Sequence, residues 1–234
     1  MVTALLVLLA IDLPKAAIVV ETERLPKSVH PDRAFILWMD NPVKHNGVLQ
    51  VYTCPDVTRG SHSYTGPTRV SLVDTRSGAI INTVEIKEQW TESEVDSFDV
   101  PIKIRRGPYS VPATLKGHEG RPKIMTLRDH NGDGVAAEFA FFDAQNCTIT
   151  NTSLVGYSIS QDRVVWYPVR IREWTDGAAH HWLDDLLTTK PVAPGHWVYR
   201  KTYNGDPGYE TVYDVRYDPA HEEFVGTVTQ KKLN

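Results

Sequence analysis

The sequence predicts an all-β, mainly antiparallel protein, built as a sandwich or as two packed β units with one short helix. Short segments rich in β-branched and aromatic residues are interrupted about every eight to twelve residues by Gly, Pro, Asn or Asp, which is typical of sandwiches and barrels. Of the 234 residues, 41% are hydrophobic and 23% are charged, so the chain can bury a core without a partner. The sequence shows no repeat of fixed period, which argues against a propeller or a solenoid.

The first half of the chain is expected to contain several strands joined by short loops. Residues 74–78, with the sequence Asp-Thr-Arg-Ser-Gly, place a glycine where a positive φ is needed and therefore predict a hairpin. The strands expected in this half are residues 34–39, 48–53, 68–73, 79–86 and 97–104.

The second half is expected to end in a three-stranded meander. Its middle strand, residues 209–217, alternates Tyr, Thr and Val with mostly charged side chains, as a half-buried antiparallel strand does. A short helix is expected at residues 178–187, where apolar side chains form a stripe and Asp176 could cap the start. The strands expected in this half are residues 123–128, 137–143, 154–160, 163–172, 196–203, 209–217 and 223–229, with a tight hairpin at Gln161-Asp162.

The N-terminus carries an apolar run, residues 4–11, that is as long as a signal-peptide core and too short to span a bilayer. We therefore expect residues 1–20 to be a signal peptide and the mature protein to be exported, periplasmic or extracellular. No Lys or Arg precedes the run, and Lys15-Ala16-Ala17 lacks the small residue that a cleavage site has two places before its last Ala. A buried first strand is the alternative.

A Pro- and Gly-rich passage, residues 107–122, is the expected boundary if the chain forms two units. These would be a β-rich unit over residues 21–110 and a second over residues 120–234. One continuous domain is the alternative, because all-β units of this length often form a single domain.

The charge distribution argues against a nucleic-acid partner. The net charge is −4 and the basic residues are scattered, so the basic patch of a DNA or RNA binder is missing. No apolar run reaches the roughly 20 residues that span a bilayer, so no membrane span is expected. A protein or a glycan of unknown identity is the expected partner.

Residues 129–134, with the sequence Asp-His-Asn-Gly-Asp-Gly, carry the clearest chemical pattern in the chain. Oxygen-bearing side chains stand at the alternate positions Asp129, Asn131 and Asp133, and the carbonyl of Val135 could join them. This set suits Ca²⁺, a hard cation that takes six to eight oxygen ligands. The segment resembles the D-x-[DN]-x-D-G calcium loops of EF-hands, dockerins and the integrin-type or FG-GAP repeats.

The resemblance departs from the EF-hand at position twelve of the loop, where Ala140 replaces the bidentate Glu, and the flanking segments look like strands. The EF-hand fold is therefore rejected. Integrin-type loops take a last carboxylate from the start of the following strand, and Glu138 is the nearest candidate, one place later than usual. The resemblance implies an ion that stabilises the fold, while a β-turn that binds nothing is the alternative.

Two further sets of residues are candidates for a disulfide and a binding loop. Cys54 and Cys147 would form a disulfide in an exported protein, and two separate buried thiols are the alternative. Residues 58–67 form a long polar segment in which Arg59, His62 and Tyr64 could bind a partner, with an ordinary solvated loop as the alternative.

Weaker candidates involve carboxylates and histidines. Glu92, Glu94 and Asp96 lie beside Trp90, as a glycoside hydrolase would need, although acidic loops are common in β proteins. The pairs His180/Asp184 and His181/Asp185 have the i,i+4 spacing of a helical metal site, and surface ion pairs are the more ordinary interpretation.

Together these observations predict a non-enzymatic, exported β protein that one Ca²⁺ stabilises and that binds a partner or polymer at the cell envelope. Two alternatives stay open. One is a secreted hydrolase of carbohydrate or peptide, with Glu92, Glu94 or the pair Cys54/His62 as catalysts. The other is a structural component of the envelope.

Overall fold

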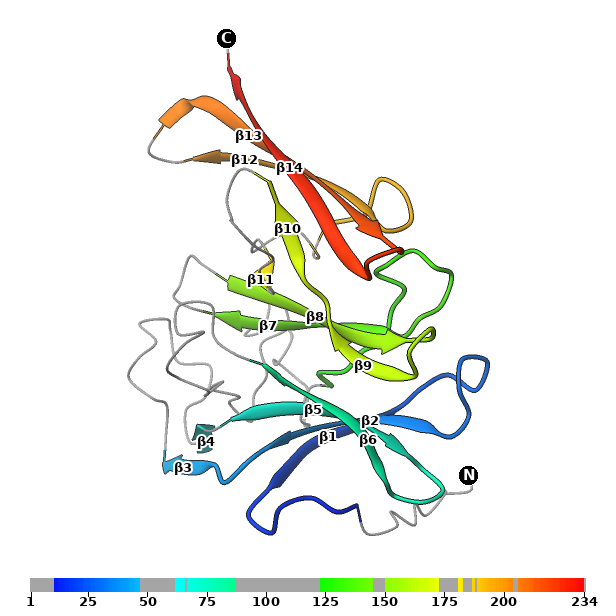
Figure 1. The fold of residues 1–234 in the computed structure, drawn as a ribbon. Coiled ribbons are helices and arrows are strands. Elements are labelled where there is room, and N and C mark those ends of the chain that lie inside the picture. Colours follow the sequence, from blue (N-terminus) through cyan, green and yellow to red (C-terminus); the bar gives the residue numbers. More distant parts are fainter. Residues whose placement is uncertain are drawn as a thin grey trace, which may run out of the picture.

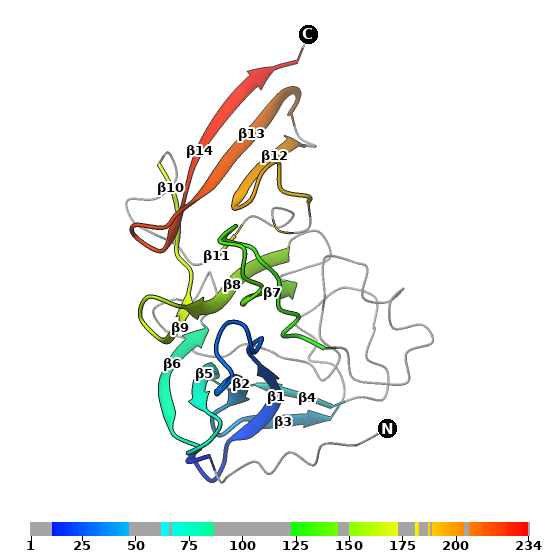
Figure 2. The same cartoon turned by 90° about the vertical axis from the view of Figure 1, so that its right-hand side faces the viewer.

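The computed structural model of the protein describes residues 11–46, 62–65, 67–86, 123–144, 150–172, 181–182, 187, 189–203 and 206–233. These residues form an all-β, mainly antiparallel structure, as predicted. Figures 1 and 2 show three sheets stacked one above another, here called the N-terminal, middle and C-terminal sheets. Among the described residues no helix is long and apolar enough to cross a membrane.

The N-terminal sheet is antiparallel throughout, in the order β1-β2-β5-β6. The predicted hairpin at residues 74–78 is confirmed, because Gly78 has φ +77° and the Asp74 carboxylate accepts hydrogen bonds from the amides of Arg76 and Ser77. The strands are β1 (Ile18–Arg24), β2 (Arg33–Met39), β5 (Thr68–Asp74) and β6 (Ile80–Ile86), beside the small pair β3 (Val43–Asn46) and β4 (His62–Thr65).

The middle sheet is built on β8, which pairs with β7 on one side and with β9 and β11 on the other. In the C-terminal sheet β12, β13 and β14 form the predicted meander, and β10 lies parallel to β14. The strands are β7 (Glu138–Ala144), β8 (Thr150–Ser158), β9 (Arg163–Trp166), β10 (Val169–Ile171), β11 (His181–Trp182), β12 (His196–Tyr203), β13 (Asp206–Asp218) and β14 (Glu223–Lys232).

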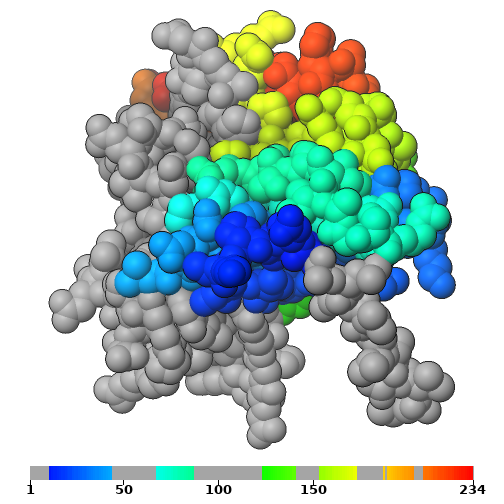
Figure 3. All heavy atoms as spheres, turned by 60° about the horizontal axis from the view of Figure 1, so that its bottom comes forward, coloured from blue at the N-terminus to red at the C-terminus, as the bar shows by residue number. Residues whose placement is uncertain are grey.

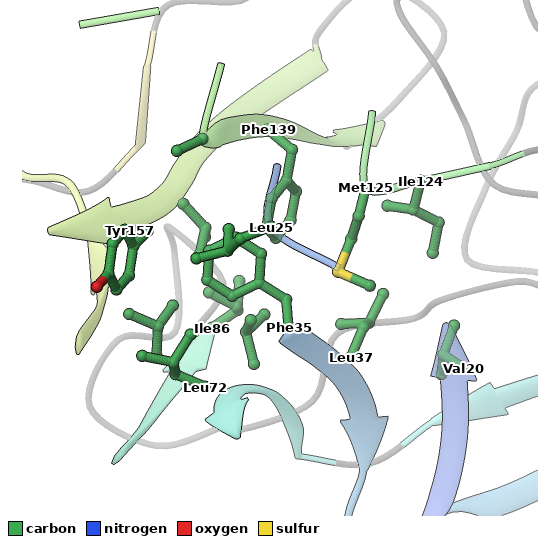
Figure 4. Packing of buried hydrophobic residues seen from close by; sticks show 14 of the residues in the cluster. Val20, Leu25, Phe35, Leu37, Leu72, Ile86, Ile124, Met125, Phe139 and Tyr157 are labelled. Atoms are coloured by element: carbon green, nitrogen blue, oxygen red, sulfur yellow. The ribbon is translucent and has the colours of Figure 1, made fainter. Parts of the chain in front are cut away.

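Two apolar cores separate the three sheets. The first lies between the N-terminal and middle sheets, where Phe35 packs edge-on against Phe139 (Figure 4). The second lies between the middle and C-terminal sheets, around Trp197 and Phe224. Neighbouring residues of β8 point into different cores, since Leu154 belongs to the second and Val155 to the first. The middle sheet is therefore buried on both faces.

A third apolar cluster lies on the outer face of the N-terminal sheet. Ile36 and Trp38 of β2 are buried there against Ile11, Leu13 and Ala17, and the blue N-terminal residues lie on this face in Figure 3. Burial on both faces explains why β2 is an almost continuous apolar run. Ile11, Leu13 and Ala17 lie within the segment predicted as a signal peptide, and Ile18 begins β1. Export stays a prediction.

The structure corrects several expected elements. The helix at residues 178–187 is wrong where it is described, because His181 and Trp182 form β11 and pair with β8. Residues 123–128 are not a strand: only Arg128 pairs, with Glu138. The segment 163–172 is divided between β9 and β10, with Pro168 in the break, since proline cannot donate to a sheet. The strands expected at residues 48–53 and 97–104 lie outside the described residues.

Asn82 joins the two sheets that enclose the first core. Its side-chain Nδ2 donates to the carbonyl of Val164 in β9, and its Oδ1 accepts from the amide of Val164, both at 2.9 Å. The side chain thus takes the place of a neighbouring strand. Val164 is buried, so its polar backbone groups depend on this pairing.

We expect Asn82→Ala to lower the free energy of unfolding by about 1–3 kcal/mol, because a buried donor and a buried acceptor lose their partner. Urea denaturation followed by circular dichroism measures the change. Ile81→Ala, at the exposed neighbouring position, is the control. Equal unfolding midpoints for the two variants would contradict the role given to Asn82.

Candidate metal centre

The acidic loop, defined as residues 129–134, precedes β7 and is closed at its base by backbone hydrogen bonds. The amide of Arg128 donates to the carbonyl of Glu138 at 2.7 Å, and the amide of Glu138 donates back at 3.0 Å. The residues between these two positions therefore form a loop whose two ends are held together by this backbone pair. The sequence between them folds locally, because it is rich in Gly, Asn and Asp.

The side chains of the acidic loop accept hydrogen bonds from its own amides. Asp129 accepts from Gly132 at 2.7 Å and from Gly134 at 3.0 Å. Asn131 Oδ1 accepts from Asp133 at 3.0 Å, and Asp133 Oδ1 accepts from Val135 at 2.8 Å. Gly132 and Gly134 have φ of +78° and +87°, which favours glycine at both positions. The chain thus wraps the three predicted ligand side chains around one turn.

Glu138 lies beneath the acidic loop at the start of β7 and is 0% exposed. Its Oε2 accepts from the amide of His130 at 2.8 Å, while its Oε1 is buried without a hydrogen-bond partner. Burial, with the negative charges of Asp133 and Asp129 as smaller contributions, raises the pKa of Glu138 to about 8. Within the described residues no ion pair joins Glu138 to a Lys or Arg.

A buried carboxylate in this setting needs a positive partner. Leaving a charged group without one in a protein interior costs several kcal/mol, so the group binds a proton or a cation. The raised pKa of Glu138 describes the first case. The oxygens of Asp129, Asn131 and Asp133 on the loop above make the second case chemically suitable for a hard cation.

Two tyrosines and a histidine surround the same loop. The Asn131 side chain lies beside the hydroxyls of Tyr167 and Tyr217, and Tyr167 also packs at Gly156 next to the Glu138 side chain. Burial lowers the pKa of His130 to about 4, so the imidazole is neutral at pH 7. Neither Tyr217 nor Tyr167 could be assigned to this site from the sequence. Their positions in β13 and before Pro168 indicate burial, but they do not indicate that both lie beside Asn131.

The chain has no match among protein-family models, curated proteins or solved structures. Across the described part of the chain, no three His, Cys, Asp or Glu side chains are arranged as a metal cage. The loop's ligand set includes an amide, Asn131, and a carbonyl, that of Val135, which here accepts from Ala137 at 3.0 Å.

The other candidate residues are not brought to this site. His62 and Tyr64 belong to β4, where their backbones pair with Asn46 and Lys44, so the predicted loop 58–67 is partly a strand. His181 lies in β11, which rules out the helical spacing predicted for it and Asp185. Outside the described residues lie Cys54, Cys147, Arg59, Glu92, Glu94, Asp96, His180, Asp184 and Asp185.

Proposed function

We propose that the acidic loop and Glu138 bind one Ca²⁺ and that this ion stabilises the fold. The buried Oε1 of Glu138 without a partner supports the proposal most strongly, because it is an unpartnered acceptor on a side chain that feels the negative charges of Asp129 and Asp133. Asp129, Asn131, Asp133 and Glu138 would supply side-chain oxygens, and Val135 would supply its carbonyl.

The residues fit this ion chemically. Each carboxylate oxygen has two lone pairs, so the hydrogen bonds that Asp129 and Asp133 accept leave capacity for a cation. Ca²⁺ tolerates irregular sets of six to eight oxygens, whereas Mg²⁺ demands near-ideal octahedral geometry. The set contains no sulfur or imidazole ligand, which disfavours Zn²⁺.

We propose further that the protein works outside the cytosol, as a binding protein of the periplasm or cell surface. Calcium sites of extracellular modules bind with Kd of about 10⁻⁴–10⁻³ M, a range in which a modest site is occupied outside the cell. Fractionation of the native cell tests the location, and an unprocessed chain found in the cytosol would overturn it. The partner or polymer stays a prediction.

We expect Ca²⁺ to raise the Tm of the wild-type chain by about 5–10 °C at saturation, because a ligand at 100 times its Kd contributes about 2.7 kcal/mol. Asp133→Ala should lose this gain, since it removes a ligand and leaves the Glu138 carboxylate in place. Thermal melts in chelator and in excess Ca²⁺, with calorimetry of Ca²⁺ binding, make the measurement.

Asp214→Ala is the matched control, because it removes one negative charge from a partly exposed side chain of β13. It should respond to Ca²⁺ as the wild type does. If wild type and Asp133→Ala melt alike in chelator and in Ca²⁺, the site does not exist. If Ca²⁺ raises all three melting temperatures equally, the ion acts elsewhere.

A further inference from the structure

The acidic loop touches the C-terminal sheet with its backbone. A Cβ atom built on Gly132 would lie 2.3 Å from the amide nitrogen of Gly195 and 2.4 Å from the carbonyl carbon of Pro194. A Cβ on Gly195 would lie 2.3 Å from the carbonyl oxygen of Asn131. The loop and the turn that precedes β12 are therefore in direct contact, with no room for a side chain between them.

This contact continues into the strands of the C-terminal sheet. The carbonyl of Gly195 accepts from the amide of Tyr217 in β13 at 2.9 Å. The His130 ring lies against the indole of Trp197 in β12, with centroids 6.3 Å apart, and Trp197 is 2% exposed in the second core. Residues 130–132 thus form part of the surface on which β12 and β13 rest.

The same three residues lie between the proposed ligands Asp129 and Asp133 and include the proposed ligand Asn131. Asn131 would bind the ion through its side chain while its carbonyl oxygen faces Gly195. His130 donates its amide to Glu138 while its ring faces Trp197. His130 and Asn131 therefore contact both the candidate ion site and the C-terminal sheet.

A second anchor of the C-terminal sheet involves no candidate ligand. Glu222, in the turn between β13 and β14, accepts from Ser158 Oγ at 2.6 Å, Ser160 Oγ at 2.7 Å and Gln161 Nε2 at 2.6 Å. These donors belong to the end of β8 and the turn that follows it. Loss of the ion would consequently loosen one anchor and leave the other in place.

We propose that the cation at the acidic loop is a latch that sets how firmly the start of the C-terminal sheet docks on the middle sheet. The inference rests on the proposed function. With Ca²⁺ bound, residues 130–132 are held in the conformation that receives Gly195 and Trp197. Without Ca²⁺, no ion links the ligand side chains of the loop. The backbone hydrogen bonds of the segment from Gly195 to Trp197 then open more often.

Hydrogen–deuterium exchange of the full chain, in Ca²⁺ and in chelator, tests the latch. We expect amides of residues 195–199 and 213–217 to exchange about tenfold more slowly in Ca²⁺, while amides of β1 and β2 change little. His130→Ala keeps the backbone and every proposed ligand but removes the ring from Trp197. It should still bind Ca²⁺ in calorimetry, with much less Ca²⁺-dependent protection of residues 195–199.

The outcomes separate the two proposals. If calorimetry detects no Ca²⁺ binding to the wild type, the proposed metal site fails and the latch fails with it. If Ca²⁺ binds but protects β1 and β2 as much as residues 195–199, or protects neither, the site stands and the latch is overturned. Equal protection of residues 195–199 in wild type and His130→Ala would also overturn it.

Discussion

The variant Gly195→Ala is expected to lose about 2–5 kcal/mol of unfolding free energy, a large loss for one added methyl group. Gly195 has φ +63°, and a left-handed conformation costs a non-glycine residue about 1–2 kcal/mol. The added methyl would also lie 2.3 Å from the carbonyl oxygen of Asn131. Because that obstacle is backbone, the turn or the acidic loop must move, and such overpacking costs about 1–3 kcal/mol more.

Gly134→Ala provides the control for this prediction. Gly134 also has a positive φ, +87°, but no atom lies within 4 Å of a Cβ built there. Its substitution should therefore show the conformational cost alone, about 1–2 kcal/mol. Urea unfolding of both variants in chelator makes the comparison. Equal losses of unfolding free energy in the two variants would contradict the close contact between Gly195 and Asn131.

The elements that local sequence predicts well are those whose causes are local. The hairpin at residues 74–78 depends on Asp74 and Gly78, which lie within five residues of each other. The meander of β12, β13 and β14 depends on alternation within each strand and on short turns between consecutive strands. In both cases the interacting residues are neighbours along the chain, so their pattern is visible without the fold.

The elements that the sequence predicts poorly depend on distant residues. Ile124 and Met125 look like part of a strand, but their amides donate to the carboxylate of Glu21 in β1 at 2.7 and 2.8 Å. Trp182 fits an apolar helical stripe, yet β8 recruits it into a sheet. Short apolar segments satisfy either structure, and the choice is made by whichever partner lies alongside.

The candidate site divides in the same way. Asp129, Asn131 and Asp133 could be grouped from the sequence, because one turn holds all three. The burial of Glu138 could not, since it depends on packing around distant Gly156, where a Cβ would lie 2.6 Å from the Glu138 side chain. Nor does any local signal connect Asn131 with Gly195. The sequence thus indicates a group of candidate ligands, but it does not indicate which part of the fold this group contacts.

The free energy of unfolding of the metal-free wild type is expected to fall as pH rises, and that of Glu138→Gln is expected not to show this fall. The pKa of Glu138 is raised by burial from an ordinary 4.5 to about 8. The folded state therefore keeps a proton that the unfolded state has released, and stability falls as pH rises from 4.5 to 8. The loss is about 5 kcal/mol at 1.36 kcal/mol per pKa unit, to order of magnitude. The neutral amide introduced by Glu138→Gln resembles the protonated acid, so this variant should not show the loss.

The interval between pH 6.5 and 8 isolates this effect. His130 acts in the opposite direction at lower pH, because its pKa is lowered to about 4 and stability is lost as pH falls below 6.5. Both proteins contain His130, so their difference in unfolding free energy reports Glu138 alone. In chelator, the unfolding free energy of Glu138→Gln minus that of the wild type should increase steadily as pH rises, by about 1 kcal/mol or more per pH unit. A difference that stays constant from pH 6.5 to 8.5 would show that Glu138 is already ionised and compensated, and the need for a cation at this position would disappear.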